Sequence, residues 1–155
     1  MRKKRVYTKD IDPDIKFDNV AISRFVNYIM RDGKKSTAQR IAYAAFDAAA
    51  KKLKKEPIEI FEKAIENASP VYEVVSKRVG GANYQVPREV RAERRFFLAC
   101  NWIIDGARAA KGRAMSEKLA DELIAAYNND GNAIKKKQQV HKMAEANRAF
   151  AHFAR

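Results

Sequence analysis

The sequence predicts a mainly α protein: a six-helix domain with an inserted two-stranded β-ribbon arm and a basic, extended N-terminal arm. Three observations predict it. Apolar residues recur at spacings of three and four along most of the chain, as on the buried faces of helices. Residues 71–87 instead contain two β-branched and aromatic runs around a Gly-Gly turn. Residues 1–16 are polar and basic, and no apolar periodicity begins before Phe17.

Composition limits the class of protein. The chain has 155 residues, of which 46% are hydrophobic, and this suits one domain (1–155) with a core of its own. Its single cysteine excludes an internal disulfide framework and fits a reducing compartment. The sequence contains no run of about 18 apolar residues, which a membrane span would need. No apolar segment follows the basic N-terminus, as one would in a signal peptide.

The charge balance indicates a polyanionic partner. Thirty-two Lys and Arg face 19 Asp and Glu, which gives a formal net charge of +13. Nucleic acid is the first candidate, an anionic membrane surface the second, and an enzyme that is merely basic the third. A membrane-surface helix needs a broad exposed apolar face, whereas the apolar stripes here are needed for helix packing. Residues 56–73 are acidic, so the positive charge is expected on one side of the molecule.

The N-terminal arm, residues 1–16, carries a dense basic run without acidic residues in its first nine positions. We expect it to be extended and to bind RNA, although an ordinary solvated terminus is the alternative. The basic residues of these nine positions are Arg2, Lys3, Lys4, Arg5 and Lys9.

Three helices are expected between the arm and the ribbon. The first follows a cap at Asp18 or Asn19 and ends with Gly33 in the C′ position. Ser36 and Gln39 are spaced as a capping box for the second, whose alanine-rich stripe permits close packing. The third helix begins at Pro57 and stops before Pro70.

The ribbon is expected over residues 71–87, with Gly80 and Gly81 in the turn and Pro87 closing the second strand. We expect it to protrude, with few residues packing back on the body. The alternative is a structural flap folded against the helices. Tyr84 is suited either to stacking on a base or to packing across the strands of the ribbon.

Three further helices are expected at about 92–110, 115–127 and 132–150. Phe97 and Cys100 lie in the apolar stripe of the first. Arginines at its start oppose the helix dipole, so an external anion could offset their repulsion. They are Arg88, Arg91, Arg94 and Arg95. The last helix opens with three consecutive lysines, Lys135, Lys136 and Lys137.

The residues offer no positive sign of an enzyme. Asp121 and Glu122 are adjacent, so they do not face each other on a helix and are interpreted as solvated charges. His141 and Glu145 suit a surface contact better than an acid–base pair. Gly80-Gly81 lacks the features of a phosphate-binding loop. No cofactor, metal or small-molecule substrate is expected, since one Cys and two His are too few for a usual zinc site.

Three motifs resemble one known family. They resemble segments of small-subunit ribosomal protein seven and occur in that family's order. The segments are residues 30–35 (MRDGKK), 76–87 (SKRVGGANYQVP), and 135–137 with 141–152. The resemblance covers essentially the whole chain. The chain is similar to the bacterial or organellar form of the family, except for its Phe153-Ala154-Arg155 ending. The resemblance implies a helical fold with a β-ribbon, and a cytoplasmic protein of the small ribosomal subunit, an organellar ribosome being the alternative.

The resemblance also implies partners and positions. The family binds the 3′ major domain of 16S ribosomal RNA and nucleates assembly of the subunit head. It lies near the exit site and neighbours ribosomal proteins nine and eleven. Positions implied to face ribosomal RNA are the basic residues of the arm with Lys34, Lys35, Lys77, Arg78, Arg91, Arg94, Arg95, Arg113, Lys135, Lys136 and Lys137. Those implied to lie near messenger RNA and exit-site transfer RNA are Arg78, Val79, Gly80, Gly81, Asn83, Tyr84, His141 and Arg148.

Overall fold

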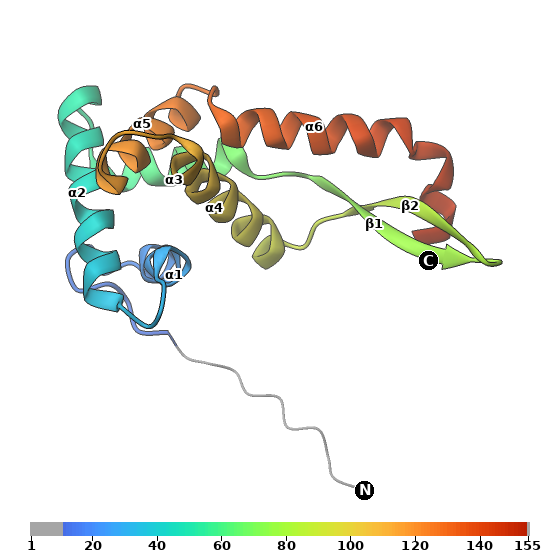
Figure 1. Cartoon of the computed structure of the whole chain (residues 1–155), viewed down its shortest axis with the longest axis horizontal. Coiled ribbons are helices and arrows are strands. Elements are labelled where there is room, and N and C mark those ends of the chain that lie inside the picture. Colours follow the sequence, from blue (N-terminus) through green and yellow to red (C-terminus); the bar gives the residue numbers. More distant parts are fainter. Residues whose placement is uncertain (1–10, 155) are drawn as a thin grey trace, which may run out of the picture.

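The computed structural model describes residues 11–154. The six expected helices and the ribbon are all present there, followed by a 3₁₀ helix (Figure 1). Their bounds are α1 Val20–Ile29, α2 Lys35–Leu53, α3 Pro57–Ala68, β1 Tyr72–Val79, β2 Ala82–Glu89, α4 Ala92–Ala109, α5 Met115–Tyr127, α6 Asn132–Ala146 and the 3₁₀ helix η1 Arg148–Ala154. The mainly α fold with an antiparallel ribbon is therefore confirmed.

The core lies among α1–α5 and the first turn of α6. Helix α5 contacts α2, α3 and α4, and Phe25, Phe46 and Phe61 fill the space between α1, α2 and α3. Centroids of these three rings lie 5.2–6.1 Å apart. Alanines of α2 are buried against their neighbours, which confirms that its small side chains permit close packing.

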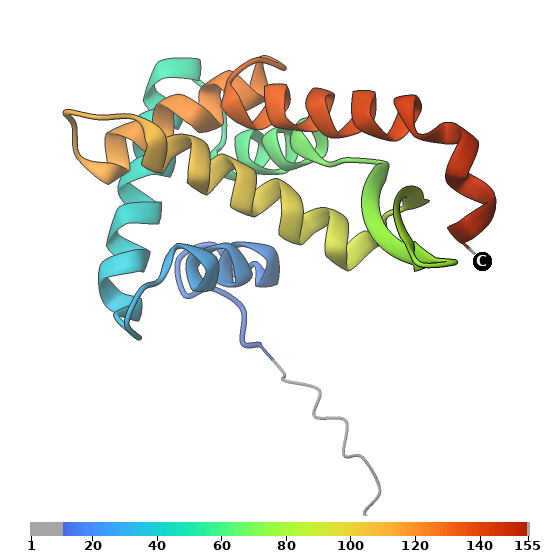
Figure 2. The same cartoon turned by 45° about the vertical axis from the view of Figure 1, so that its right-hand side comes forward.

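Helix α6 and the ribbon leave this body side by side, and η1 turns back toward the ribbon (Figures 1 and 2). Strands β1 and β2 are antiparallel, with Tyr72 opposite Glu89 and Val79 opposite Ala82. Both strands contact α6, β2 also packs on η1, and Lys77 of β1 bonds to the Phe153 carbonyl of η1. The expectation that few ribbon residues pack back is therefore wrong: the ribbon projects from the body, but together with a helical support.

Two helix ends differ from expectation. Met30 is the C-cap of α1, and its N–H bonds to the Val26 carbonyl, so Gly33 lies farther on, in the loop, with φ +71°. Helix α2 begins at Lys35 with Lys34 as N-cap, and within the described residues no side chain caps it. The expected Ser36 capping box is wrong because the helix starts before that serine. By contrast, Asn19 caps α1 as expected, accepting from the Ala21 N–H at 2.8 Å.

The end of the N-terminal arm is folded rather than extended. Residues 1–10 lie outside the described residues, but Asp14 is buried and accepts hydrogen bonds from the N–H groups of Lys16 and Phe17. Its other oxygen accepts from the Tyr43 hydroxyl at 2.8 Å, and Lys16 pairs with Asp47. Burial, followed by this hydrogen bond, raises the pKa of Tyr43 to about 12. Residues 15–17 therefore form a turn, and Asp14 fastens the chain to α2.

Other boundaries also differ from expectation. The ribbon spans 72–89 rather than 71–87, because Pro87 pairs with Val74 inside it, and an unpaired sheet edge tolerates the missing N–H. The last α-helix ends at Ala146, and the chain tightens into η1 from Arg148. Phe97 is 38% exposed rather than inward, with its ring edge-on to Tyr28.

A buried carboxylate fixes the start of α6. Glu122 of α5, interpreted above as solvated, is 7% exposed and accepts from the Ala133 N–H at 2.8 Å. Ala133 lies in the first turn of α6, where N–H groups have no partner within the helix. A carboxylate from a neighbouring helix thus does the work of a capping residue and holds α6 at a defined place on the body.

Candidate nucleic-acid interface

The loop between α1 and α2 exposes Lys34 and Lys35 at the beginning of a helix. The unpaired N–H groups and the dipole of a helix N-terminus favour anions, and the two lysines add to that preference. A shallow pocket of about 400 Å³ adjoins the loop, and Lys34, Arg31 and Arg108 are among its lining residues. This part of the predicted interface is exposed and suited to phosphate.

The ribbon turn presents a second set of predicted residues. Gly80 and Gly81 have φ of +58° and +92°, and this left-handed backbone explains the glycine pair. Just before the turn, Arg78 is opposite Asn83, and both are exposed. Val79 is half-buried. One guanidinium and one amide therefore project beside a thin turn.

The other face of the ribbon is occupied by the C-terminal segment. Tyr84 is half-buried, with its ring 5.2 Å from Phe150 and 5.3 Å from Phe153. Lys77, opposite Tyr84, donates from Nζ to the Phe153 carbonyl at 2.6 Å. The Tyr84 ring thus packs against η1, a partner that neither of its two expected roles includes, and stacking on a base stays a prediction.

The arginine cluster surrounds an internal anion. Glu73 of β1 is buried, and its carboxylate accepts from Arg88 Nε and Nη2 at 3.0 and 2.7 Å and from Arg94 Nε at 3.2 Å. Burial works to raise the pKa of Glu73, but these bonds hold it below the usual value. Part of the charge that seemed to need an external anion is thus offset by β1. Arg91 is exposed, and Arg95 is half-buried with an Nε atom that has no partner among residues 11–154.

Arg113 is likewise engaged within the protein. Its Nη1 lies 2.8 Å from Asp121 Oδ2, and Lys52 Nζ lies 2.7 Å from Oδ1 of the same carboxylate. The hydrogen bond from Lys52 is the main reason that the pKa of Asp121 is lowered. Asp121 is therefore a bridge between α2, α5 and the loop before α5, and not an isolated solvated charge. Arg113 stays 56% exposed and can still meet solvent.

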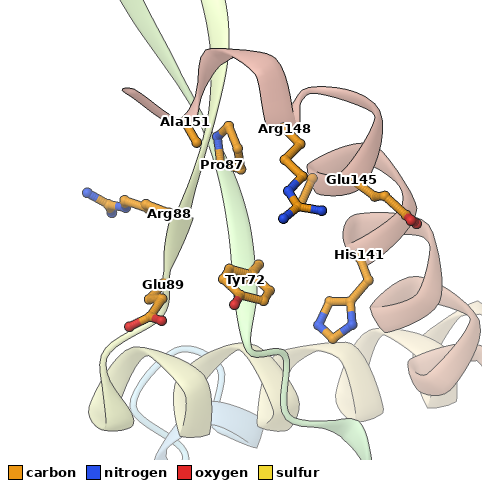
Figure 3. A pocket seen from close by; sticks show the side chains of 9 residues that line it. Tyr72, Pro87, Arg88, Glu89, His141, Glu145, Arg148 and Ala151 are labelled. Carbon is orange, nitrogen blue, oxygen red and sulfur yellow. The ribbon is translucent and has the colours of Figure 1, made fainter. Parts of the chain in front are cut away.

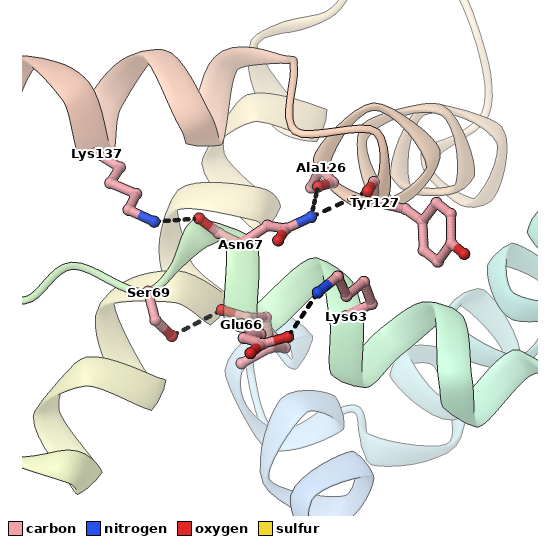
Figure 4. Close-up of polar contacts among 8 residues, drawn as sticks. Lys63, Glu66, Asn67, Ser69, Ala126, Tyr127 and Lys137 are labelled. Carbon is pink, nitrogen blue, oxygen red and sulfur yellow. Dashed lines mark hydrogen bonds and ion pairs between the residues drawn. The ribbon is translucent and has the colours of Figure 1, made fainter.

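The three lysines of α6 divide between two environments. Lys135 and Lys136 are exposed, whereas Lys137 is half-buried and donates from Nζ to the Asn67 carbonyl at 2.6 Å (Figure 4). Asn67 lies in the last turn of α3, and its amide donates to carbonyls of α5. A cation at a helix C-terminus is favourable. Burial lowers the pKa of Lys137. Lys137 therefore ties α6 to α3 instead of pointing outward.

A pocket of about 620 Å³ separates the ribbon from the last helix (Figure 3). Tyr72 and Pro87 line it from the strands, and His141 and Arg148 from the other side. His141 Nε2 accepts from the Val71 N–H at 3.1 Å, and its ring is edge-on to Tyr72. Burial and the charge of Lys137 lower the pKa of His141. His141 thus joins α6 to the start of the ribbon.

Cys100 is fully buried, and burial raises the pKa of its thiol, so it is a core residue as predicted. Among residues 11–154, no cluster of three His, Cys, Asp or Glu side chains could hold a metal ion. None of the helices in this described range is long and apolar enough to cross a membrane. The predicted arm residues Arg2, Lys3, Lys4, Arg5 and Lys9 lie outside it.

Sequence reasoning missed the supporting residues. Alternation of Glu73 with the apolar Tyr72 and Val74 predicts a solvent-facing position in a strand, so no local signal in the sequence indicates its burial. Phe150 and Phe153 are three apart near the chain end, a spacing that puts both rings on one face of a helical turn. Their partner Tyr84 is distant in the sequence, and no local pattern connects it with them.

The sequence also matches known proteins. The family described as Ribosomal protein S7p/S5e matches residues 1–148. The chain belongs to this family. Proteins named small ribosomal subunit protein uS7 from Thermotoga petrophila and Chloroflexus aggregans are both 56% identical to it, over 153 and 154 residues. That from an Anaeromyxobacter strain is 55% identical over 152 residues. These matches cover 98–99% of this chain and 97–99% of each relative.

Proposed function

We propose that the protein is a structural constituent of the small ribosomal subunit that binds the 3′ major domain of 16S ribosomal RNA and nucleates assembly of the subunit head. Family membership over almost the whole chain carries this proposal, since the relatives are named as small-subunit ribosomal proteins. The same membership supports a structural role. The location would be a cytoplasmic or organellar ribosome.

The distribution of exposed cations supports RNA as the partner. Exposed basic residues lie on the α1–α2 loop, the ribbon turn, the start of α4 and the start of α6, including Lys34, Lys35, Arg78, Arg91, Lys135 and Lys136. A regular duplex groove is usually met by one helix or one ribbon. Separate patches on several elements instead suit an irregularly folded RNA.

We also propose that the ribbon and α6 lie near the exit site, where they approach messenger RNA and exit-site transfer RNA. Ribosomal proteins nine and eleven would be neighbours. The projection of both elements away from the body supports this, because a projecting arm can reach a ligand that the body does not touch. Arg78 and Asn83 at the turn, with His141 and Arg148 at its support, would be the nearest side chains.

A salt titration tests RNA binding. Removing residues 1–9 deletes five basic residues, and if about four meet phosphates, the slope of log affinity against log salt falls by roughly three. The double variant Lys135→Gln/Lys136→Gln should lower the slope by about 1.4, at about 0.7 for each contact. Lys51→Gln/Lys54→Gln removes equal charge from exposed positions of α2 and its C-cap, outside the predicted interface, and should leave the slope unchanged.

The measurement uses purified protein with a 3′ major domain transcript, and with anionic vesicles as the competing polyanion. Footprinting on 16S RNA locates the site. Equal slopes for the two lysine pairs would show unspecific attraction and contradict a defined interface. Stronger binding to vesicles than to the transcript would contradict the RNA assignment itself.

A further inference from the structure

The half of the ribbon nearest the turn packs against two aromatic side chains of η1. Tyr84 contacts both Phe150 and Phe153, with centroid distances of 5.2 and 5.3 Å. The two phenylalanine rings lie 6.3 Å apart and only 12° from parallel. Such separations are typical of aromatic pairs that stabilise a contact beyond the area they bury. The ribbon is therefore held by side chains at the far end of the sequence.

A polar contact secures the opposite strand at the same level. Lys77 of β1 is directly opposite Tyr84 of β2, and its Nζ lies 2.6 Å from the Phe153 carbonyl. Both strands are thus attached to η1 at one pair of residues. One strand is attached by an aromatic contact and the other by a charge-assisted hydrogen bond.

A separate attachment lies at the base of the ribbon. The Val71 N–H donates to His141 Nε2 of α6 at 3.1 Å. An isolated two-stranded ribbon is only marginally stable in water and has no fixed direction relative to the body. Attachment to α6 at the base and to η1 near the turn restricts bending of the ribbon between these points.

We propose that Phe150 and Phe153 are positioning residues that clamp the ribbon against α6 and η1 and so set where Arg78 and Asn83 point. Tyr84 acts through this packing, and contact with a partner at the turn falls to the exposed pair Arg78 and Asn83. The effect of the clamp at the exit site rests on the proposed function, whereas the clamp itself does not.

Hydrogen exchange of the free protein tests the clamp. In Phe150→Ala/Phe153→Ala, the amides of residues 74–86 that are protected in the unchanged protein should exchange about tenfold faster. Amides of α1–α5 should keep their rates. Tyr84→Phe keeps the ring and should behave like the unchanged protein, as should Met143→Ala, which removes an exposed apolar side chain from α6. Unchanged ribbon exchange in the double variant would overturn the proposal.

Two measurements keep the test decisive. Should the double variant not fold, Tyr84→Leu removes the cluster from the other side and should give the same selective acceleration. In subunits reconstituted with the double variant, retention of exit-site transfer RNA should fall while assembly proceeds. A loosened ribbon with normal retention supports the clamp and contradicts the proposed exit-site role. Acceleration spread equally over all helices would overturn the clamp, because it shows general destabilisation.

Discussion

Gly106 of α4 faces the buried carboxylate of Glu122, and replacing it with alanine should reveal how tightly that carboxylate is held. A Cβ added at Gly106 would lie 2.8 Å from Glu122 Cδ and 2.9 Å from Oε1. Distances this short require one group to move. Glu122 cannot move freely, because Oε1 accepts from the Ala133 N–H at 2.8 Å and the side chain is only 7% exposed.

Two effects of opposite sign determine how much Gly106→Ala changes the free energy of unfolding. Alanine is better than glycine inside a helix by about 1 kcal/mol. Overpacking costs about 1–3 kcal/mol, and weakening a buried hydrogen bond to a charged group costs about 1.5–3 kcal/mol. The unfavourable contributions are the larger, so Gly106→Ala should lower the free energy of unfolding by about 2 kcal/mol. For a chain of this size, that corresponds to a fall in Tm of about 4–8 °C.

Urea unfolding followed by circular dichroism measures this change, and a double-mutant cycle identifies its cause. Glu122→Ala alone should be destabilising, because it leaves the buried Ala133 N–H without a partner. In that background, Gly106→Ala no longer meets a carboxylate and should be neutral or stabilising by up to about 1 kcal/mol. A single Gly106→Ala variant at least as stable as the unchanged protein would refute this reasoning.

Three further predictions concern charged groups. The pKa of His141 is lowered in the folded protein, so the unfolded chain binds more protons. The free energy of unfolding should therefore decline as the pH falls below about 6.5. His141→Gln should flatten this decline in urea melts compared at pH 7.5 and 5.5. Glu73→Gln should cost about 1 kcal/mol in the same melts, a modest value because its arginine partners are half exposed. Lys137→Gln should lower the melting temperature without changing the RNA salt slope, whereas Lys136→Gln should do the reverse.

The helices and the ribbon could be predicted because their signals are local. Periodic apolar residues, Asn19 as a cap, Pro57 at a helix start and the Gly80-Gly81 turn each act within a few residues. What could not be predicted depends on contacts between distant segments. Asp14 meets Tyr43 across 29 residues, and such a contact has no local signature.

The candidate site divides in the same way. Exposure of Lys34, Lys35 and Arg78 follows from their places in a loop and beside a turn. The engagement of Arg94 with Glu73, and of Arg113 with Asp121, depends on which carboxylates the fold brings near. Net charge therefore predicts the class of partner, but it overstates how many cations are uncommitted.

The lysine run of α6 shows where helix geometry alone sharpens that inference. Successive residues of an α-helix are rotated by about 100°, so three consecutive lysines span about 200° and cannot all face one partner. Where such a run overlaps the stripe that packs on the body, one of its ends is turned inward. Here Lys137 points inward, where the Asn67 carbonyl at the end of α3 accepts its hydrogen bond. Lys135 and Lys136 remain outward. The run in α6 thus contains one structural anchor and two exposed lysines, and the angular position of each lysine relative to the buried stripe, which the sequence itself contains, separates them.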